Sequence, residues 1–223
     1  MIQFLKRNLK KPNWHFLRNT RPLSTVFGLD RGLPVDRYYI ERFLDANRSL
    51  ISGRVLEVGE DLYAKRYGSD VERIDILHVD SSNRHATIVG DLARPNSLPS
   101  DLADCFICTQ TLNFIFDLKA AIHGIHTILK PGGTVLATAA GICQISRYDM
   151  DRWGDFWRFT PKSLERLFSD HFGADNVTVA SSGNVLSAIA LLEGLAAEEL
   201  SSAELDYYDA DYPVVLTVKA VKR

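Results

Sequence analysis

The sequence predicts an α/β fold whose sheet is mostly parallel, and three stretches of the chain support this. Residues 55–58 form a short apolar run that leads into Gly59, and residues 74–79 form a second run that leads into Asp80. Short runs between turn residues are typical of buried parallel strands. A third run, residues 134–138, follows a helix-ending Pro-Gly-Gly segment. Because ligands of open α/β sheets sit beyond the carboxyl ends of the strands, we expect the site there.

Length and composition restrict the classes of protein that fit. The 223 residues suit one domain, in which residues 1–50 precede the first core strand and residues 51–223 form the core. The formal net charge of -2 gives no electrostatic basis for a nucleic-acid partner. No apolar run approaches the ~20 residues of a membrane-spanning helix. Three cysteines are a low and odd number, which favours a reducing compartment, and we expect a cytoplasmic protein.

Two pairs of residues look like metal ligands but are better explained as structure. Cys105 and Cys108 lie three positions apart in an apolar strand pattern, so their side chains are expected on opposite faces of the sheet. His123 and His126 share a helix face, but no third ligand is in view. We therefore predict no metal ion at either pair.

Periodicity and turn residues predict the remaining elements. An amphipathic helix fits residues 38–50, and a short helical turn fits residues 61–67, where Gly68 ends it. Thr160 and Pro161 begin a helix that runs to about residue 168. The other expected elements are strands at 104–109, 177–179 and 214–221, and helices at 118–129 and 185–200.

The loop after the first strand indicates which kind of ligand the sheet binds. A strand, a glycine and an acid about twenty residues further on, here Asp80, form the pattern of a nucleotide site in which the acid binds ribose hydroxyls. Gly59 is followed by Glu60 and Asp61, which would repel a pyrophosphate. They suit a cationic ligand without phosphate, and S-adenosylmethionine (SAM) is such a ligand. Glu57 lies in the buried strand and needs a partner there.

Four further motifs stand along the chain: Glu57-x-Gly59, Ile88-Val89-Gly90-Asp91-Leu92, Leu129-Lys130-Pro131-Gly132-Gly133 and Asp155-x-Trp157-Arg158-Phe159-Thr160. They resemble those of class I SAM-dependent methyltransferases, in particular the subgroup called type 11. The resemblance implies a Rossmann-like three-layer sandwich, with a seven-stranded, mostly parallel sheet whose last strand is antiparallel. It also implies that Asp91 receives the adenine amino group, with the Leu92 amide beside it.

The chain also departs from the family pattern. The two later glycines of the first motif are missing, and Asn113 and Phe114 replace a Glu-His pair that is common after the fourth strand. The tetrapeptide of methyltransferases that act on exocyclic nitrogens is absent there, which argues against such an acceptor. The residues predicted to bind the cofactor are Glu57, Gly59, Asp61, Tyr63, Asp80, Ser81, Asp91, Leu92 and Gln110.

The segment before the first strand often covers the cofactor in this family. The loop of residues 30–32 is therefore placed to touch SAM or substrate, and the alternative is that Arg31 and Arg37 form surface ion pairs. Further upstream, basic and apolar residues alternate, and we interpret them as a solvated helix docked by its apolar side. The alternative is attraction to an anionic partner, such as a phosphorylated sugar or a membrane surface. The basic residues are Lys6, Arg7, Lys10, Lys11, Arg18 and Arg21.

A long polar and aromatic loop, residues 140–160, follows the fifth strand and is where a substrate site is expected. Trp153 and Trp157 offer flat faces to sugar rings, with core packing as the alternative. Arg158 is interpreted as paired with a carboxylate rather than catalytic. A divalent ion at the loop aspartates is a further alternative. The predicted general bases are Asp149, Asp151 and Asp155, with Tyr148 as a positioning group.

Together these observations predict a methyltransferase that moves the SAM methyl group to a hydroxyl of a small molecule, sugar or glycolipid. The sugar acceptor is suggested by the aromatic loop and by resemblance to methyltransferases of glycan assembly. The alternative is a degenerate SAM-binding domain that serves as a scaffold, because the glycine loop is depleted. RNA methylation is disfavoured by the net charge. The sequence predicts no oligomeric state.

Overall fold

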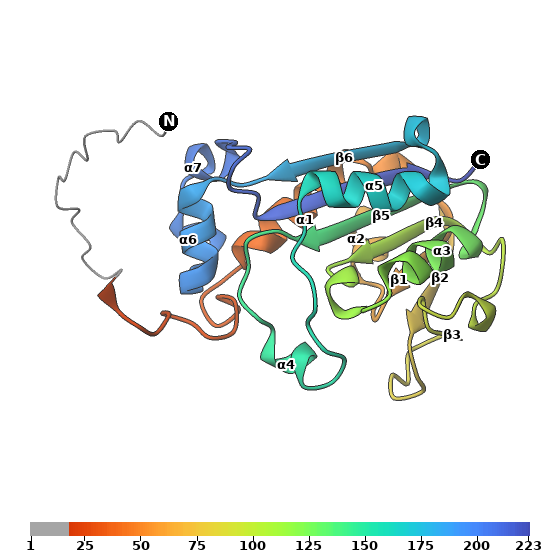
Figure 1. The fold of residues 1–223 in the computed structure, drawn as a ribbon, viewed down its shortest axis with the longest axis horizontal. Helices are drawn as coiled ribbons and strands as arrows, with labels where there is room; N and C mark the ends of the chain where they lie inside the picture. The colour runs from red at the N-terminus through yellow and green to blue at the C-terminus, as the bar shows by residue number, and fades with distance from the viewer. Residues whose placement is uncertain (1–17) are drawn as a thin grey trace, which may run out of the picture.

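The computed structural model describes residues 18–223 (Figure 1). The predicted basic helix at Lys6, Arg7, Lys10 and Lys11 therefore lies outside the described residues. The described part contains a seven-stranded sheet in the order β3-β2-β1-β4-β5-β7-β6. Its strands are β1 (Gly53–Val58), β2 (Val71–His78), β3 (Ile88–Val89), β4 (Ala103–Thr109), β5 (Leu129–Ala140), β6 (Val177–Ser182) and β7 (Val215–Val221).

Strands β1 to β5 run parallel, and β7 is antiparallel to both of its neighbours. This confirms the predicted sheet with its antiparallel last strand. Strand order reverses between β1 and β4, so the carboxyl ends of the central strands open onto a crevice where open α/β sheets bind ligands.

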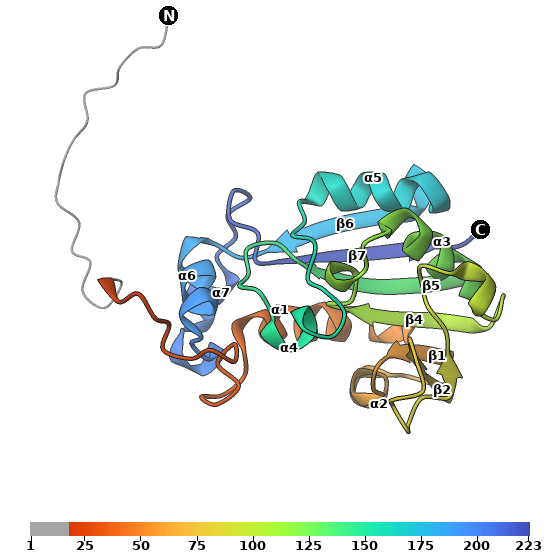
Figure 2. The same ribbon diagram turned by 60° about the horizontal axis from the view of Figure 1, so that its bottom comes forward.

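Helices cover both faces of the sheet, which makes the fold three layers thick (Figure 2). On one face α3 and α5 pack against β4 and β5 through a core that includes Ile122 and Phe168. On the other face α1, α2 and α6 pack through a core that includes Ile40 and Leu191. The helices are α1 (Val35–Ala46), α2 (Leu62–Tyr67), α3 (Leu118–Ile128), α4 (Arg147–Met150), α5 (Pro161–Phe172), α6 (Val185–Glu193) and α7 (Ser202–Asp206).

The cysteine pair lies as the strand pattern predicts. Cys105 belongs to the core on the α1 face and Cys108 to the core on the α3 face, because residues three apart on a strand point in opposite directions. Both thiols are free and fully buried, and burial raises the pKa of each to about 12. They are therefore inert packing residues.

The long helix predicted for residues 185–200 is wrong in its second half. Helix α6 ends at Glu193, because Gly194 adopts the left-handed conformation with φ +72°. A Cβ atom at this position would lie 2.4 Å from the carbonyl oxygen of Ser24, so only glycine fits. The chain then turns back, and Ala196 forms a bridge with Pro34 just before α1. The turn thus attaches the N-terminal segment to the core.

Helix α1 also differs from the prediction, because it begins at Val35 rather than at residue 38. Pro34 precedes it with extended backbone angles, and a proline is well suited to the start of a helix. The earlier start places Asp36 and Arg37 in the first turn, close to the carboxyl ends of the strands.

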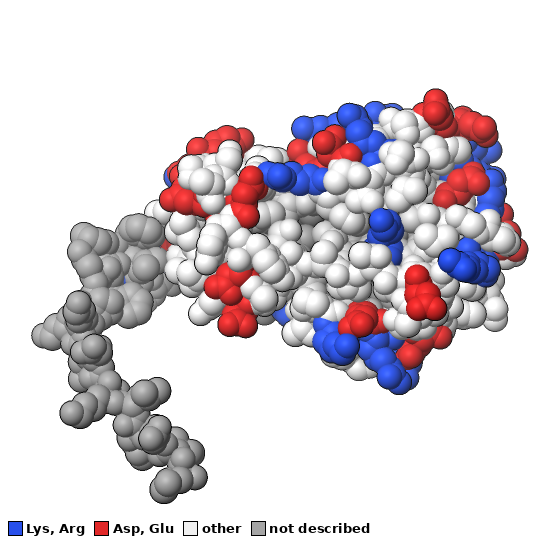
Figure 3. Space-filling model, turned by 90° about the horizontal axis from the view of Figure 1, so that it is seen from above, with Lys and Arg blue, Asp and Glu red and all other residues white. Residues whose placement is uncertain are grey.

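Within residues 18–223, no helix combines the length and the apolar character that crossing a bilayer requires. On the face shown in Figure 3, acidic and basic side chains are interspersed. The absence of a nucleic-acid partner stays a prediction.

Candidate functional site

The carboxyl ends of β1, β4 and β5 border a cavity of about 500 Å³. Four segments line it: the end of the N-terminal segment with the first turn of α1, the glycine loop after β1, the residues after β4, and the loop after β5. A cavity of this size falls in the usual range for a small-molecule site. The predicted location of the site at this edge of the sheet is therefore consistent with the structure.

The glycine loop leaves the cavity open where a ligand would need room. Gly59 has φ +81°, and no atom lies within 4 Å of the place where a Cβ would be. Its carbonyl oxygen accepts a hydrogen bond of 2.7 Å from Asn83 Nδ2, which ties the loop after β2 to the glycine loop. Glu60 lines the cavity next to Gly59. Asp61 instead lies at the start of α2, where it pairs with Lys65 at 2.7 Å.

Glu57 lies behind the glycine loop rather than in the cavity. Its carboxylate is 1% exposed and accepts hydrogen bonds from the backbone amides of Tyr63 at 3.2 Å and Ala64 at 2.8 Å. These are amides of the first turn of α2, which have no partner within the helix. Glu57 thereby fixes the angle at which the chain leaves the glycine loop. Burial raises the pKa of Glu57 to about 7.

This pKa shift predicts how stability depends on pH. The folded pKa lies above the value of about 4.3 in an unfolded chain, so the native state binds the proton more tightly. The contribution of Glu57 to stability is therefore fully present below about pH 4 and is lost as the pH rises through 7. Glu57→Gln should flatten this fall in the free energy of unfolding, measured by urea denaturation across the range. Exposed Glu165 on α5 provides the control Glu165→Gln, and equal slopes in parent and Glu57→Gln would contradict the prediction.

The predicted ribose and adenine acids follow the ends of β2 and β3. Asp80 accepts a hydrogen bond of 2.9 Å from the Ser82 amide, and its side chain is 51% exposed. Its neighbour Ser81 lies in the same exposed turn. Asp91 accepts a bond of 2.9 Å from the Ala93 amide and keeps a side-chain exposure of 32%. Both acids thus lie on the same edge of the sheet as Gly59 with carboxylate surface still exposed.

Two more predicted cofactor residues differ in their surroundings. Leu92 is buried and packs in the α3-side core. Gln110, directly after β4, lines the cavity with an unusual φ of +47°. Its Nε2 atom is buried and has no hydrogen-bond partner among the described residues. A buried donor without a partner is costly, so an acceptor on a bound ligand would fit this position.

Asp36 and Arg37 belong to the site, although the sequence analysis did not predict the role of either. Both line the cavity from the first turn of α1. Oδ1 of Asp36 accepts the Arg37 amide at 2.8 Å, and burial raises the pKa of this carboxyl. The guanidinium of Arg37 donates to the hydroxyl of Tyr63 and lies 5.8 Å from the centre of that ring. Tyr63 does not line the cavity itself but contacts Arg37, which does. An Asp-Arg pair just after Pro34 was the only available sequence signal.

The charged residues Asp30 and Arg31 of the N-terminal loop do not line the cavity. Arg31 pairs with Glu199, and Asp30 accepts a hydrogen bond of 2.5 Å from Ser24 Oγ. Arg31 therefore forms an ion pair, which was the alternative to contact with SAM or substrate, and its partner is Glu199. Phe27 and Leu29 of the same segment line the cavity.

The loop after β5 separates the three predicted bases. Asp149 lines the cavity and accepts a hydrogen bond of 2.6 Å from Ser146 Oγ. Asp151 is 68% exposed, lies 3.9 Å from Arg147 and does not line the cavity. Tyr148 lines the cavity but is 66% exposed, with Arg152 stacked 3.5 Å from its ring centre. Of these three residues, Asp149 and Tyr148 line the cavity, whereas Asp151 does not.

Asp155 lines the wall of the cavity but is engaged in an ion pair. Its side chain is 1% exposed, and both oxygens accept from Arg158, at 2.5 and 2.9 Å. Burial would raise the pKa of Asp155, but hydrogen bonds from Arg158 and the Ser146 amide outweigh it and hold the pKa below its usual value. The prediction that Arg158 pairs with a carboxylate is confirmed. A carboxylate held in this way is a poor proton acceptor.

The two tryptophans of the loop lie outside the cavity lining. Trp157 donates from Nε1 to the Ile115 carbonyl at 3.1 Å and stacks on Phe116 at 5.9 Å between ring centres. It therefore has the packing role that the sequence left as the alternative. Trp153 is 37% exposed and contacts His78 edge to face.

As for metal, the described residues contain no group of three candidate ligands.

Residues 52–137 match a family model described as a methyltransferase domain. No curated protein matches the chain. A SAM-dependent methyltransferase from Mesorhizobium loti is similar in structure, with a TM-score of 0.53 and 16% identity, covering 87% of this chain and 100% of that chain. The N-methyltransferase NodS from Bradyrhizobium japonicum, in complex with S-adenosyl-l-homocysteine, gives 0.51 at 14% identity, with coverages of 87% and 90%. The cyclase SpnF gives 0.54 at 19% identity, with coverages of 86% and 83%.

Residues 52–137 are thus similar to a methyltransferase domain, and the described residues have the fold of SAM-dependent methyltransferases. The predicted fold is confirmed, and these similarities support SAM as the cofactor. The structural similarities are below 25% identity, and folds of this kind carry many activities. The acceptor must therefore be argued from the residues of the cavity.

Proposed function

We propose that this methyltransferase transfers the SAM methyl group to a hydroxyl of a small molecule, sugar or glycolipid intermediate. The observation that carries the proposal is the cavity at the strand ends, whose lining includes the glycine loop, Gln110, Asp36 and Asp149. The glycine loop offers a place for a cationic cofactor, and the two carboxylates can meet an acceptor hydroxyl. SAM supplies an electrophilic methyl group, and the protein aligns an acceptor with it.

The cavity residues suit the charged groups of the cofactor. Glu60 lies beside Gly59 and can pair with the ammonium group. Arg37 lines the same cavity and can pair with the carboxylate, because its guanidinium is already oriented by Tyr63. Outside the cavity lining, Asp80 and Asp91 keep exposed carboxylate oxygens for the ribose and the adenine amino group. Gln110 Nε2 is available for a cofactor acceptor atom.

Asp36 is our candidate for the general base. A hydroxyl acceptor has a pKa far above neutral, so its proton must leave as the methyl group arrives. In residues 18–223, Oδ2 of Asp36 makes no hydrogen bond, and burial raises the pKa of this carboxyl. Asp149 is fixed by Ser146 and is better suited to orient the acceptor. Asp151 and Asp155 are not placed for proton transfer.

A degenerate binding domain is the second candidate. It is favoured by one observation, the replacement of the later glycines of the first motif by Glu60 and Asp61. Under this alternative the domain binds SAM without turnover. The structural similarity to SpnF, whose name is that of a cyclase, shows that the fold by itself does not settle the reaction.

Two measurements separate these candidates. Thermal stabilisation by SAM, with NAD as a control, tests the cofactor, since the acids of the glycine loop should repel a pyrophosphate. Mass spectrometry of nucleotide sugars and glycolipid intermediates incubated with SAM tests for a methyl mass shift. SAM binding without transfer to any acceptor class supports the scaffold, and stronger stabilisation by NAD would overturn both candidates.

Removal of the carboxylate proposed to bind the ribose should weaken the binding of SAM. Asp80→Ala should reduce the affinity for SAM by about 1.5–3 kcal/mol, the range for a hydrogen bond to a charged group. Isothermal titration calorimetry measures the difference, and Asp175→Ala, at an exposed position in the turn after α5, is the matched control. Parental affinity in Asp80→Ala would show that another residue holds the ribose.

A further inference from the structure

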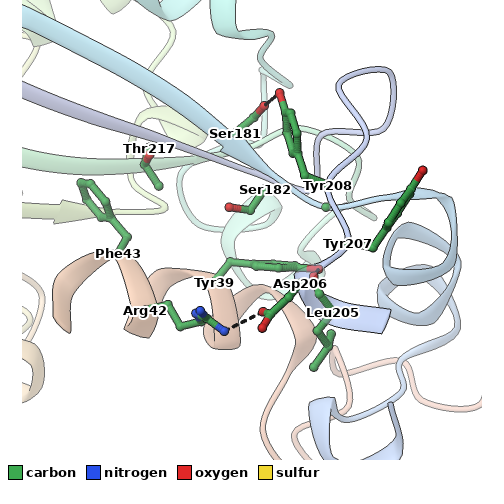
Figure 4. Close-up of a pocket in the computed structure, with 11 residues that line it drawn as sticks. Tyr39, Arg42, Phe43, Ser181, Ser182, Leu205, Asp206, Tyr207, Tyr208 and Thr217 are labelled. Carbon is green, nitrogen blue, oxygen red and sulfur yellow. Dashed lines mark hydrogen bonds and ion pairs between the residues drawn. The ribbon is translucent and has the colours of Figure 1, made fainter. Parts of the chain in front are cut away.

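A second cavity of about 370 Å³ lies between α1 and the antiparallel edge of the sheet, formed by β6 and β7 (Figure 4). The segment that follows α7 closes its remaining side. Among the described residues, its lining and that of the SAM cavity have no member in common. Helix α1 contributes to both: Asp36 and Arg37 line the first cavity, whereas Tyr39 and Arg42 line the second. The second cavity therefore needs an explanation of its own.

Hydroxyl groups dominate the polar lining of this second cavity. Ser182 and Thr217 come from adjacent strands, and Thr217 is only 7% exposed. Neither side-chain hydroxyl makes a hydrogen bond to a described residue. Ser181, the residue before Ser182 in β6, has its Oγ 3.2 Å from the Tyr208 hydroxyl. Each hydroxyl can donate and accept, so the lining suits a ligand that does both.

The charges at the rim compensate each other. Arg42 and Asp206 form an ion pair of 2.6 Å (Figure 4). The Tyr38 hydroxyl donates to the same carboxylate at 2.7 Å. Arg42 and Asp206 are the charged residues that line the second cavity. A ligand with a net charge would find no uncompensated partner here, so the cavity favours a neutral ligand.

Aromatic rings supply the apolar part of the lining. Tyr39 is buried at the floor, where its hydroxyl donates to the Leu205 carbonyl at 2.8 Å. Tyr207 and Tyr208 stand at the rim and remain 67% and 55% exposed. Two neighbouring exposed rings next to a hollow are typical of a binding surface. They offer flat faces against which C–H groups can stack.

We propose that this second cavity is a binding site for one ring of a neutral carbohydrate. A sugar ring carries many hydroxyls on its edge and an apolar C–H surface on its face. It can therefore bond Ser182 and Thr217 while it stacks on Tyr208. The volume lies at the lower end of the range for small-ligand sites, which suits a single ring. This site is independent of the acceptor in the SAM cavity.

Saturation-transfer NMR tests the proposal with the methyl glycosides of glucose, galactose, mannose and N-acetylglucosamine. Each is used at about 10 mM, which saturates a site of millimolar Kd. At least one glycoside should bind, and Tyr208→Ala should weaken it about tenfold through lost stacking. Thr217→Val keeps the shape and removes the hydroxyl, so it should also weaken binding, by up to about tenfold. Tyr212→Ala is the control, because Tyr212 is an exposed tyrosine of the same region outside the cavity lining.

Two results would overturn the proposal. One is that none of the four glycosides receives saturation from the parent. The other is that a glycoside binds but keeps its affinity in both Tyr208→Ala and Thr217→Val. Thermal stabilisation by SAM, recorded on each variant, shows that the fold and the first cavity are intact. Because that measurement does not involve the second cavity, a failure here leaves the methyltransferase proposal in place.

Discussion

Asp36→Asn should lower the rate of methyl transfer by roughly 10²–10⁴-fold, the usual contribution of a general base. Asn keeps the size and polarity of the side chain but cannot accept a proton. Affinity for SAM should change little, because the proposed cofactor contacts come from other residues. Single-turnover methyl transfer, measured once an acceptor is in hand, gives the rate. Asp149→Asn should lower it by only about tenfold, because Asp149 orients the acceptor without taking its proton.

Asp151→Asn is the matched control for both variants. It is the same substitution in the loop after β5, at an exposed position outside the cavity. The pH dependence provides a second readout, because a base must be deprotonated to work. Burial raises the pKa of Asp36, so the parental rate should rise with pH through that pKa and then level off. Asp36→Asn should lose this limb. Parental rates in both Asp36→Asn and Asp149→Asn would mean that alignment alone drives the reaction.

Much of the fold was predictable because its strands are encoded locally. The apolar runs that lead to Gly59 and Asp80 are buried strands, and their length and turn residues suffice to identify them. The end of α6 was not predictable in this way. Gly194 is left-handed because the chain around Ser24 packs against it, and this contact joins residues far apart in the sequence. A local pattern favours helix through such a glycine.

The site shows the same division between local and distant signals. Its location at the strand ends follows from a general rule about parallel sheets. Arg158 could be assigned to an ion pair because the pair with Asp155 is only three residues apart. Asp36 could not be assigned, because it reaches the cavity only through the packing of α1 on the sheet. The role of Asp36 was not predicted because this residue is far in sequence from the strand ends that it approaches in the fold.

The ion pair between Arg158 and Asp155 is the second place where a large effect is expected. Arg158→Ala should reduce the free energy of unfolding by about 3–5 kcal/mol, because it leaves a buried carboxylate without its partner. Arg158 also donates to the carbonyls of Cys143 at 3.2 Å and Gln144 at 2.6 Å, so the substitution releases both ends of the loop. Urea denaturation measures the loss. Arg152→Ala, on the same loop but at the surface, should cost less than about 1 kcal/mol.

The dependence of this loss on pH distinguishes an unpaired carboxylate from simple loss of packing. In the parent the pKa of Asp155 lies below its unfolded value, so its contribution is present above about pH 4 and is lost as the pH falls through the folded pKa. Without Arg158, burial raises the pKa of Asp155 instead, and the variant should lose stability as the pH rises. The difference between parent and Arg158→Ala should therefore be larger at pH 7 than at pH 4. An equal difference at both pH values would show that the guanidinium acts through packing rather than charge.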